Sequence, residues 1–277
     1  MLAEDIWIEQ LDEQLARSIQ KACEPPHYNI TTSESDRHLY AFVRRVTSTE
    51  KINYQGMDEL LAVAALSRLI HPTSIGNRYC AKVFHFGSAA SSIQALQYKG
   101  VSPDVFLSAP QRDWLSIEDA ETLRRLMPWL SPRKPWHGRI HRAYWNHEYA
   151  MRSFYLDQRW ILVVSGIEAL INIGDQNNCR QFCDRVQQIA GEFGIDFAQH
   201  DLQHAYKLRS KVIHAESFLH GLENVVPRTQ QRDLYDKLEL LLRTVVRRSL
   251  LDESFGNAFR DDAAVRARWP LKTTEKR

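Results

Sequence analysis

One segment near the middle of the chain constrains the fold more than any other: residues 157–173, DQRWILVVSGIEALINI. Its apolar side chains recur at helical spacing, and further apolar residues extend that face almost all the way round the helix. Such a helix is stable only where other helices cover most of its surface. The apolar run is too short to cross a membrane, and Glu168 interrupts it. It therefore predicts the central helix of a soluble bundle.

The sequence around this segment predicts the rest of the bundle. Helical patterns separated by short connections cover residues 138–154, 178–193, 201–214 and 229–252. Gly174 lies where the central helix should end, because glycine favours the position after a helix C-terminus. Short connections between long apolar helices are typical of antiparallel bundles. We expect a mainly α protein with a C-terminal antiparallel bundle of four to five helices.

Charge and proline content divide the chain. The first 130 residues hold 13 basic and 16 acidic side chains, whereas residues 131–277 hold 23 and 18. The divide falls in a stretch with three prolines, where a helix must stop: Pro128, Pro132 and Pro135. We predict three parts: a mostly helical N-terminal region of unassigned role at 1–130, the helical bundle at 131–256 and a loose, charged C-terminal tail at 257–277.

The N-terminal region has weaker patterns. Residues 3–22 and 57–70 show helical spacing, whereas residues 78–86 suit a strand or a short helix. Ser116, with Asp119 three residues later, is typical of a helix start, and Pro128 ends that helix. We therefore expect at least three helices in this region.

Composition excludes several classes of protein. The chain is 44% apolar with a net charge of +2, which excludes collagen-like, disordered and low-complexity chains and a polybasic coat for nucleic acid. The N-terminus has no secretory signal, and the four cysteines are sparse, so we expect a cytoplasmic protein with reduced thiols and no membrane contact. Cys179 and Cys183 are spaced to share a metal or a disulfide, but ordinary helix-face cysteines are the preferred interpretation.

The common catalytic motifs are missing from the sequence. It contains no Walker loop and no GxGxxG, HExxH or GxSxG pattern. Two histidine pairs have helical spacing, His137 with His141 and His200 with His204. Neither has a nearby third ligand, so surface histidines are the preferred interpretation. We expect no metal and no cofactor.

Arginine followed by histidine after four to six residues occurs three times, at Arg78–His85, Arg142–His147 and Arg209–His214. This is about the number expected by chance, so the spacing alone indicates nothing. The third match differs in its context, because it ends a helix that follows the central apolar helix and precedes the long last one. RWILVVSGIEALIN followed by YKLRSKVIHAE resembles HEPN-domain proteins, specifically the Apea-like group.

The resemblance covers residues 115–252, including LSIEDAETLRRLMPWL, and departs from the family pattern at Ala215, where glycine is usual. It implies a metal-independent endoribonuclease that cleaves RNA by 2′-hydroxyl transesterification, with Arg209 and His214 as catalytic residues. The residue types suit this chemistry, because histidine titrates near neutral pH and a guanidinium can grip two phosphate oxygens. Members often act as toxins or phage-defence effectors, which implies an antitoxin or regulatory partner.

A homodimer is also expected. Residues five apart on a helix point about 140° from each other, so Arg209 and His214 do not share one face. They converge if the helix ends at His214 and the arginine reaches round, or if two copies of the chain meet. The resemblance implies the second arrangement, with the site at the dimer seam.

Supporting roles follow for three neighbours. A buried carboxylate needs a partner, and Arg209 is the candidate for Glu168, which would then orient it. Tyr206, one turn before Arg209, would pack at the site or bond a phosphate, and Ser210 would bond RNA or the facing chain. The structural alternatives stay open: Glu168–Arg209 as a purely structural ion pair and Tyr206 as a core residue.

Lys207 and Lys211 would add positive charge for RNA phosphates, or form ordinary solvated surface. Two alternatives to a nuclease also stay open. One is a catalytically inactive HEPN helical module that binds RNA, a nucleotide or a protein partner. The other is a purely structural helical protein in which the Arg209–His214 pair is coincidental.

Overall fold

The computed structural model describes residues 1–3, 5–23, 39–45, 54–72, 81–86, 89–95, 115–131, 134–172, 174, 177–213 and 228–271. The chain forms two compact units, Met1–Leu130 and Ser131–Arg277, which divide within the proline-rich stretch. The described part is mainly helical with few short strands, so the mainly α prediction is confirmed at that level.

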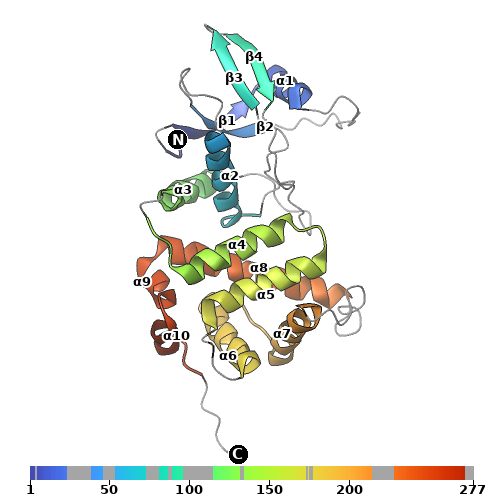
Figure 1. Ribbon diagram of the computed structural model, residues 1–277, viewed down its shortest axis with the longest axis vertical. Helices are drawn as coiled ribbons and strands as arrows, with labels where there is room; N and C mark the ends of the chain where they lie inside the picture. Colours follow the sequence, from blue (N-terminus) through green and yellow to red (C-terminus); the bar gives the residue numbers. More distant parts are fainter. Residues whose placement is uncertain are drawn as a thin grey trace, which may run out of the picture. The chain divides into compact units, whose positions relative to one another are not determined.

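Helices and two strand pairs alternate along the described part of the N-terminal unit. In chain order these elements are β1 (Ile6–Leu11), α1 (Glu13–Cys23), β2 (Leu39–Arg44), α2 (Tyr54–Arg68), β3 (Ala81–Phe86), β4 (Ala89–Ala95), α3 (Ile117–Leu126) and the 3₁₀ turn η1 (Met127–Leu130). Strand β1 pairs antiparallel with β2, and β3 with β4, in two separate sheets (Figure 1). The second pair contains a register shift between Phe84 and His85.

The predicted helix over residues 3–22 is wrong in its first half. Residues Ile6–Leu11, IWIEQL, form β1, with Ile6 opposite Arg44 and Leu11 opposite Leu39. Isoleucine and tryptophan favour strands, and pairing with a segment about 30 residues away decides the conformation. The helix starts only after Asp12, whose carboxylate accepts a hydrogen bond from the Leu15 amide at 2.8 Å.

The two remaining helices of this unit follow the sequence more closely. In α2, residues 63–66 are buried, as their run of small and apolar side chains predicts. Helix α3 begins with a capping box, as expected from its sequence. The Ser116 hydroxyl accepts from the Asp119 amide at 3.1 Å, and the Asp119 carboxylate accepts from the Ser116 amide at 2.9 Å.

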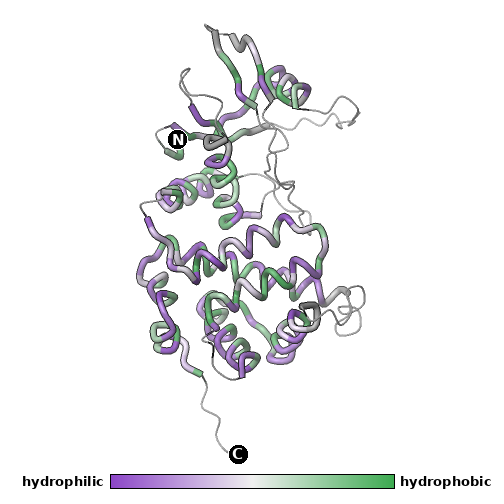
Figure 2. Tube along the Cα trace, viewed as in Figure 1, coloured by the Kyte–Doolittle hydropathy of each residue, from purple (hydrophilic) through white to green (hydrophobic). Residues whose placement is uncertain are grey.

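Helices make up the described part of the C-terminal unit. They are α4 (Gly138–Arg152), α5 (Leu156–Ile171), α6 (Asn178–Gly191), α7 (Gln199–Ile213), α8 (Arg228–Leu251), α9 (Glu253–Gly256), the 3₁₀ turn η2 (Asn257–Phe259) and α10 (Asp262–Arg268). Helices α4 and α5 lie side by side as an antiparallel hairpin joined at residues 153–155 (Figure 1). Hydrophilic and hydrophobic residues alternate along these helices, as expected where one face is buried (Figure 2).

Helix α5 is central to this unit, as its apolar sequence predicts. It packs against α4, α6, α7 and α8, and Trp160, Val163 and Val164 are buried on it. Gly166 marks the closest approach, because a Cβ atom there would lie 2.7 Å from a methyl group of Leu242 on α8. A larger residue at position 166 would require the Leu242 side chain to move.

The C-terminal tail predicted over 257–277 is not loose where the structure describes it, up to residue 271. Helix α9, η2 and α10 pack into the unit, and Phe255, Phe259, Val265 and Trp269 are buried. The rings of Phe259 and Trp269 lie 4.9 Å apart. These short helices lack a long periodic pattern, but their four apolar anchors attach the segment to the bundle.

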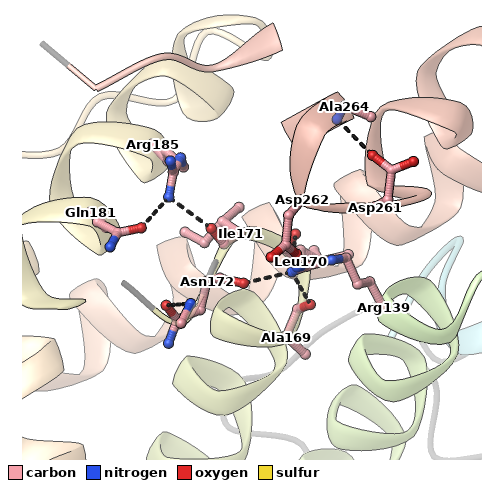
Figure 3. A network of polar contacts seen from close by, with 11 residues as sticks. Arg139, Ala169, Leu170, Ile171, Asn172, Gln181, Arg185, Asp261, Asp262 and Ala264 are labelled. Carbon is pink, nitrogen blue, oxygen red and sulfur yellow. Dashed lines mark hydrogen bonds and ion pairs between the residues drawn. The ribbon is translucent and has the colours of Figure 1, made fainter. Parts of the chain in front are cut away.

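Two arginines satisfy the carbonyl groups at the carboxyl end of α5 (Figure 3). From α4, Arg139 donates from Nη1 to three backbone oxygens, those of Asn172 at 2.8 Å and of Ala169 and Leu170 at 3.3 Å. The last carbonyls of a helix have no partner within it and favour a positive charge. Gly174, predicted as the cap, lies two residues beyond the observed cap, Asn172, and has a φ of 71°.

The second arginine, Arg185 of α6, is almost fully buried. It donates from Nη1 to the Ile171 carbonyl at 3.1 Å and from Nε to the Trp269 carbonyl, also at 3.1 Å (Figure 3 shows the first bond). Arg139 likewise forms an ion pair with Asp262 of α10. Both arginines therefore join the end of α5 to the C-terminal segment.

Candidate functional site

Helix α5 places Glu168 in an apolar setting. The helix turns Ile167 and Leu170 into the core beside it, and the Glu168 side chain is 8% exposed. An ionised carboxylate at such a position loses most of its hydration and needs a partner. The sequence predicts this requirement, and the partner comes from α7.

Helix α7 presents Tyr206 and Arg209 to Glu168 from one face, since residues three apart on a helix are neighbours. The Arg209 Nη2 atom lies 2.8 Å from Glu168 Oε2, and the Tyr206 hydroxyl hydrogen-bonds to the same carboxylate. The Tyr206 ring packs against Phe182 of α6, with 5.4 Å between ring centroids. The three functional groups therefore converge where α5 and α7 meet.

Burial and pairing set the electrostatics of this cluster. Burial raises the pKa of Glu168, and the opposing effects of Arg209 and the Tyr206 hydrogen bond only partly offset it. Burial also raises the pKa of Tyr206, and the Glu168 carboxylate raises it further. Tyr206 is therefore a neutral hydrogen-bond donor at physiological pH.

Arg209 keeps unused donor capacity. Its side chain is 28% exposed, and its Nε atom is buried with no hydrogen-bond partner among the described residues. A guanidinium has five N–H donors, of which the Glu168 carboxylate can take two at most. The remaining donors suit an anion with several oxygens, such as a phosphate.

The structure brings together only part of the predicted site. Helix α7 ends at Ile213, and His214 and Ala215 lie outside the described residues, so the Arg209–His214 geometry stays a prediction. Ser210 is half-buried on α7. Lys207 is exposed on the same helix, and Lys211 lies in its last turn with a side chain outside the described part.

A second Arg-x4-His match, at Arg142 and His147, does not form a site in the described structure. Arg142 is exposed on α4, whereas His147 is fully buried on the opposite face. His147 Nε2 lies 2.8 Å from Glu239 of α8, and Arg243 Nε donates to the same carboxylate oxygen at 2.9 Å. Sequence reasoning missed this buried cluster, and the carboxylate in the apolar run LELLL was its only signal.

The candidate metal ligands do not assemble into a site among the described residues. Across the described residues, no three His, Cys, Asp or Glu side chains are grouped to hold a metal. His141 Nε2 accepts a hydrogen bond from the Trp145 indole at 2.9 Å, and the rings of His200 and His204 lie 6.1 Å apart. Cys179 and Cys183 are free thiols, and burial raises the pKa of Cys183.

Comparison with models of protein families, with curated proteins and with solved structures found no match for this chain. None of the described helices is both long enough and apolar enough to span a membrane.

Proposed function

We propose that the protein is a metal-independent HEPN endoribonuclease in which Arg209 and His214 act on RNA. The 2′-hydroxyl of one nucleotide attacks its own phosphate, a bond from the 2′-oxygen to phosphorus forms, and the bond to the 5′-oxygen breaks. The products carry a 2′,3′-cyclic phosphate and a 5′-hydroxyl. One proton leaves the 2′-hydroxyl and one joins the departing 5′-oxygen, so the reaction needs a base and an acid but no metal.

His214 supplies the acid–base chemistry in this proposal, because imidazole gains and loses a proton near neutral pH. Arg209 binds the phosphate and stabilises the extra negative charge of the five-coordinate phosphorane. A homodimer would bring two copies of the pair to one seam, which provides a histidine for each proton transfer. Tyr206, Ser210, Lys207 and Lys211 would contact RNA or the facing chain.

The single observation that carries the proposal is the way Arg209 is held. Glu168 binds one end of the guanidinium at 2.8 Å, while the Arg209 side chain stays 28% exposed. An arginine that is fixed in place and retains spare donors is prepared to bind a phosphate without further reorganisation. His214 follows five residues later, just beyond the end of α7.

A toxin or phage-defence role in the cytoplasm, with an antitoxin or a regulatory partner, fits such a nuclease. The N-terminal unit would then restrain the nuclease, sense a trigger or select the RNA. These roles follow from the family resemblance alone and belong to the same proposal.

Cleavage of end-labelled transfer RNA and total RNA in EDTA tests the proposed activity. We expect the parent protein to cut and to leave cyclic-phosphate ends, and His214→Ala to be inactive with unchanged folding. Arg209→Ala should lower the rate by about 10²–10³-fold, the usual cost of removing a group that stabilises transition-state charge. Equal cleavage by parent and His214→Ala would reject the assignment.

The alternative is a catalytically inactive HEPN module that binds RNA, a nucleotide or a protein partner. The Glu168–Arg209 ion pair is compatible with this alternative, because a buried ion pair can have a purely structural role. RNA binding by the parent without cleavage, weakened by Arg209→Ala but not by His214→Ala, would identify this alternative.

A further inference from the structure

The outer face of α4 consists of aromatic and basic side chains. Its exposed side chains are His141, Arg142, Trp145 and Tyr149, and the turn that follows adds exposed Phe154 and Tyr155. We call these six residues the α4 aromatic face. No aliphatic side chain is exposed on α4, which the structure describes throughout. Exposed aromatic rings in a row are unusual, because contact of apolar surface with water is unfavourable. Such a row therefore indicates a binding surface.

The rings of this face are held in order. The Trp145 indole donates to His141 Nε2 at 2.9 Å, and its ring stacks on Tyr149 with 5.7 Å between centroids and 30° between planes. Buried Tyr144 packs edge-on against Trp145 at 5.3 Å and supports it from within the unit. The indole is therefore oriented before any partner binds, which lowers the entropy cost of binding.

The charge of the face favours an anionic partner. Arg142 is exposed one turn before Trp145. The one carboxylate of α4, Glu148, is fully buried and forms an ion pair with Arg152 at 2.6 Å. The C-terminal half of the sequence, residues 131–277, also carries the excess of basic residues. Aromatic rings interleaved with arginine suit nucleic acid, because bases stack on the rings and phosphates pair with the guanidinium.

We propose that the α4 aromatic face is a stacking platform for unpaired bases of RNA. Every base has a π-face that can stack on Trp145 or Tyr149, whereas the bases of a duplex already stack on each other and are not available. The platform would select single-stranded or looped RNA whatever its sequence. It rests on the proposed function only for the choice of RNA as ligand, since binding there requires no cleavage.

Fluorescence anisotropy of a labelled 12-nucleotide RNA, alone or in a duplex of the same sequence, tests the platform. The full-length chain carries His214→Ala in every sample, so that the RNA stays intact. Trp145→Ala and Tyr149→Ala should each weaken single-strand binding about tenfold, the usual loss of one stacked base. Trp145→Phe, which keeps a π-face, should stay within about threefold of the parent, because phenylalanine also stacks.

Leu271→Ala is the matched control, because Leu271 is 39% exposed, as Trp145 is, and lies beyond α10. It should leave binding unchanged. Urea unfolding of each variant checks that a loss of binding does not follow from unfolding, since Trp145 also packs against Tyr144 and Tyr149. The loss caused by Trp145→Ala should persist at higher salt, whereas Arg142→Ala should reduce the salt dependence, because only the arginine releases counterions.

Several results would overturn the platform. Unchanged binding by Trp145→Ala would do so, as would equal affinity for the duplex, or an equal loss with Trp145→Phe. A change from dimer to monomer with unaltered RNA binding would identify the face as a contact between copies of the chain. If the parent chain, with His214 intact, cleaves no RNA while Trp145→Ala weakens binding, the platform is supported and the nuclease rejected. Cleavage by the parent chain, together with unchanged binding by Trp145→Ala, would support the nuclease and reject the platform.

Discussion

Glu168 and Glu239 are both buried carboxylates paired with an arginine, yet their pKa values move in opposite directions. Burial raises the pKa of Glu168, because Arg209 and the Tyr206 hydroxyl compensate only in part. Burial also disfavours the charged form of Glu239, but Arg243 and His147 together outweigh it and lower the pKa to about 2. The number and closeness of the partners, rather than burial alone, determine which carboxylate is firmly charged.

The Glu239 pKa makes stability depend on pH. A carboxyl group whose pKa falls from 4.5 to about 2 on folding stabilises the protein above the unfolded value, and that contribution is lost as the pH falls towards 2. We expect the free energy of unfolding in urea to fall by about 3 kcal/mol over this range. Glu239→Gln should lower stability at pH 7 and flatten this dependence, whereas the exposed Glu253→Gln should change neither. An equally steep dependence in Glu239→Gln would contradict this account.

Glu168→Gln separates a positioning role from a structural one. Its raised pKa means that ionised Glu168 costs stability as the pH rises above the ordinary value of 4.5, so a neutral glutamine should not destabilise the fold. Without the ion pair, Arg209 is less firmly placed, and kcat for RNA cleavage should fall about 10- to 100-fold. Unfolding in urea and single-turnover cleavage are the two measurements. An unchanged kcat with altered stability would leave Glu168 with a structural role only.

At the scale of elements, the packing of α9 against α8 depends on a glycine. A Cβ atom at Gly256 would lie 2.5 Å from the backbone oxygen of Ser249, and a backbone atom cannot move aside as a side chain can. Gly256→Ala should therefore lower the free energy of unfolding by roughly 1–3 kcal/mol. Gly138→Ala, at the start of α4 with open space around its Cβ position, is the control and should be neutral or slightly stabilising. Equal urea midpoints for the two variants would contradict this explanation.

The helices of the C-terminal unit are predictable from sequence because their apolar residues repeat every three to four positions over several turns. Strand β1 is not, because IWIEQL is too short for its period to exclude a helix, and its pairing with β2 depends on residues far along the chain. The helical structure of residues 257–271 was also not predicted from the sequence. Phe259 lies in the short turn η2 and Trp269 follows the end of α10, so they form no pattern within one element.

The candidate site was predictable to a similar degree. A lone carboxylate in an apolar helix requires a cationic partner, and that rule leads from Glu168 to Arg209. The cluster of His147 and Glu239 was not found, because its members are 92 residues apart and the Arg-x4-His match at His147 does not point to Glu239. The requirement of a single buried side chain for a partner can therefore be predicted from sequence. Pairings between residues of distant elements can be identified only once the fold is known.

For the whole molecule, the proposed dimer makes activity depend on concentration. If two copies of the α5–α7 cluster form the seam, dilution should separate them, and cleavage per chain should fall as monomers accumulate. Sedimentation equilibrium should show a mass that rises from 32.3 kDa to twice that value as the concentration increases. Cleavage per chain that stays constant from dimer to monomer would contradict a shared site.

The arginines at the end of α5 also bear on where the chain can be cut. Arg185 donates to the backbone of Trp269, and Arg139 pairs with Asp262. The same two arginines bond the carbonyl groups at the end of α5, so they link the last helices to the central helix. Trypsin recognises arginine, and Arg260, Arg266 and Arg268 lie in this segment. These arginines are exposed, but cleavage beside them requires the helical backbone to unfold locally. The rate of proteolysis at these three positions therefore reports how often this C-terminal segment opens.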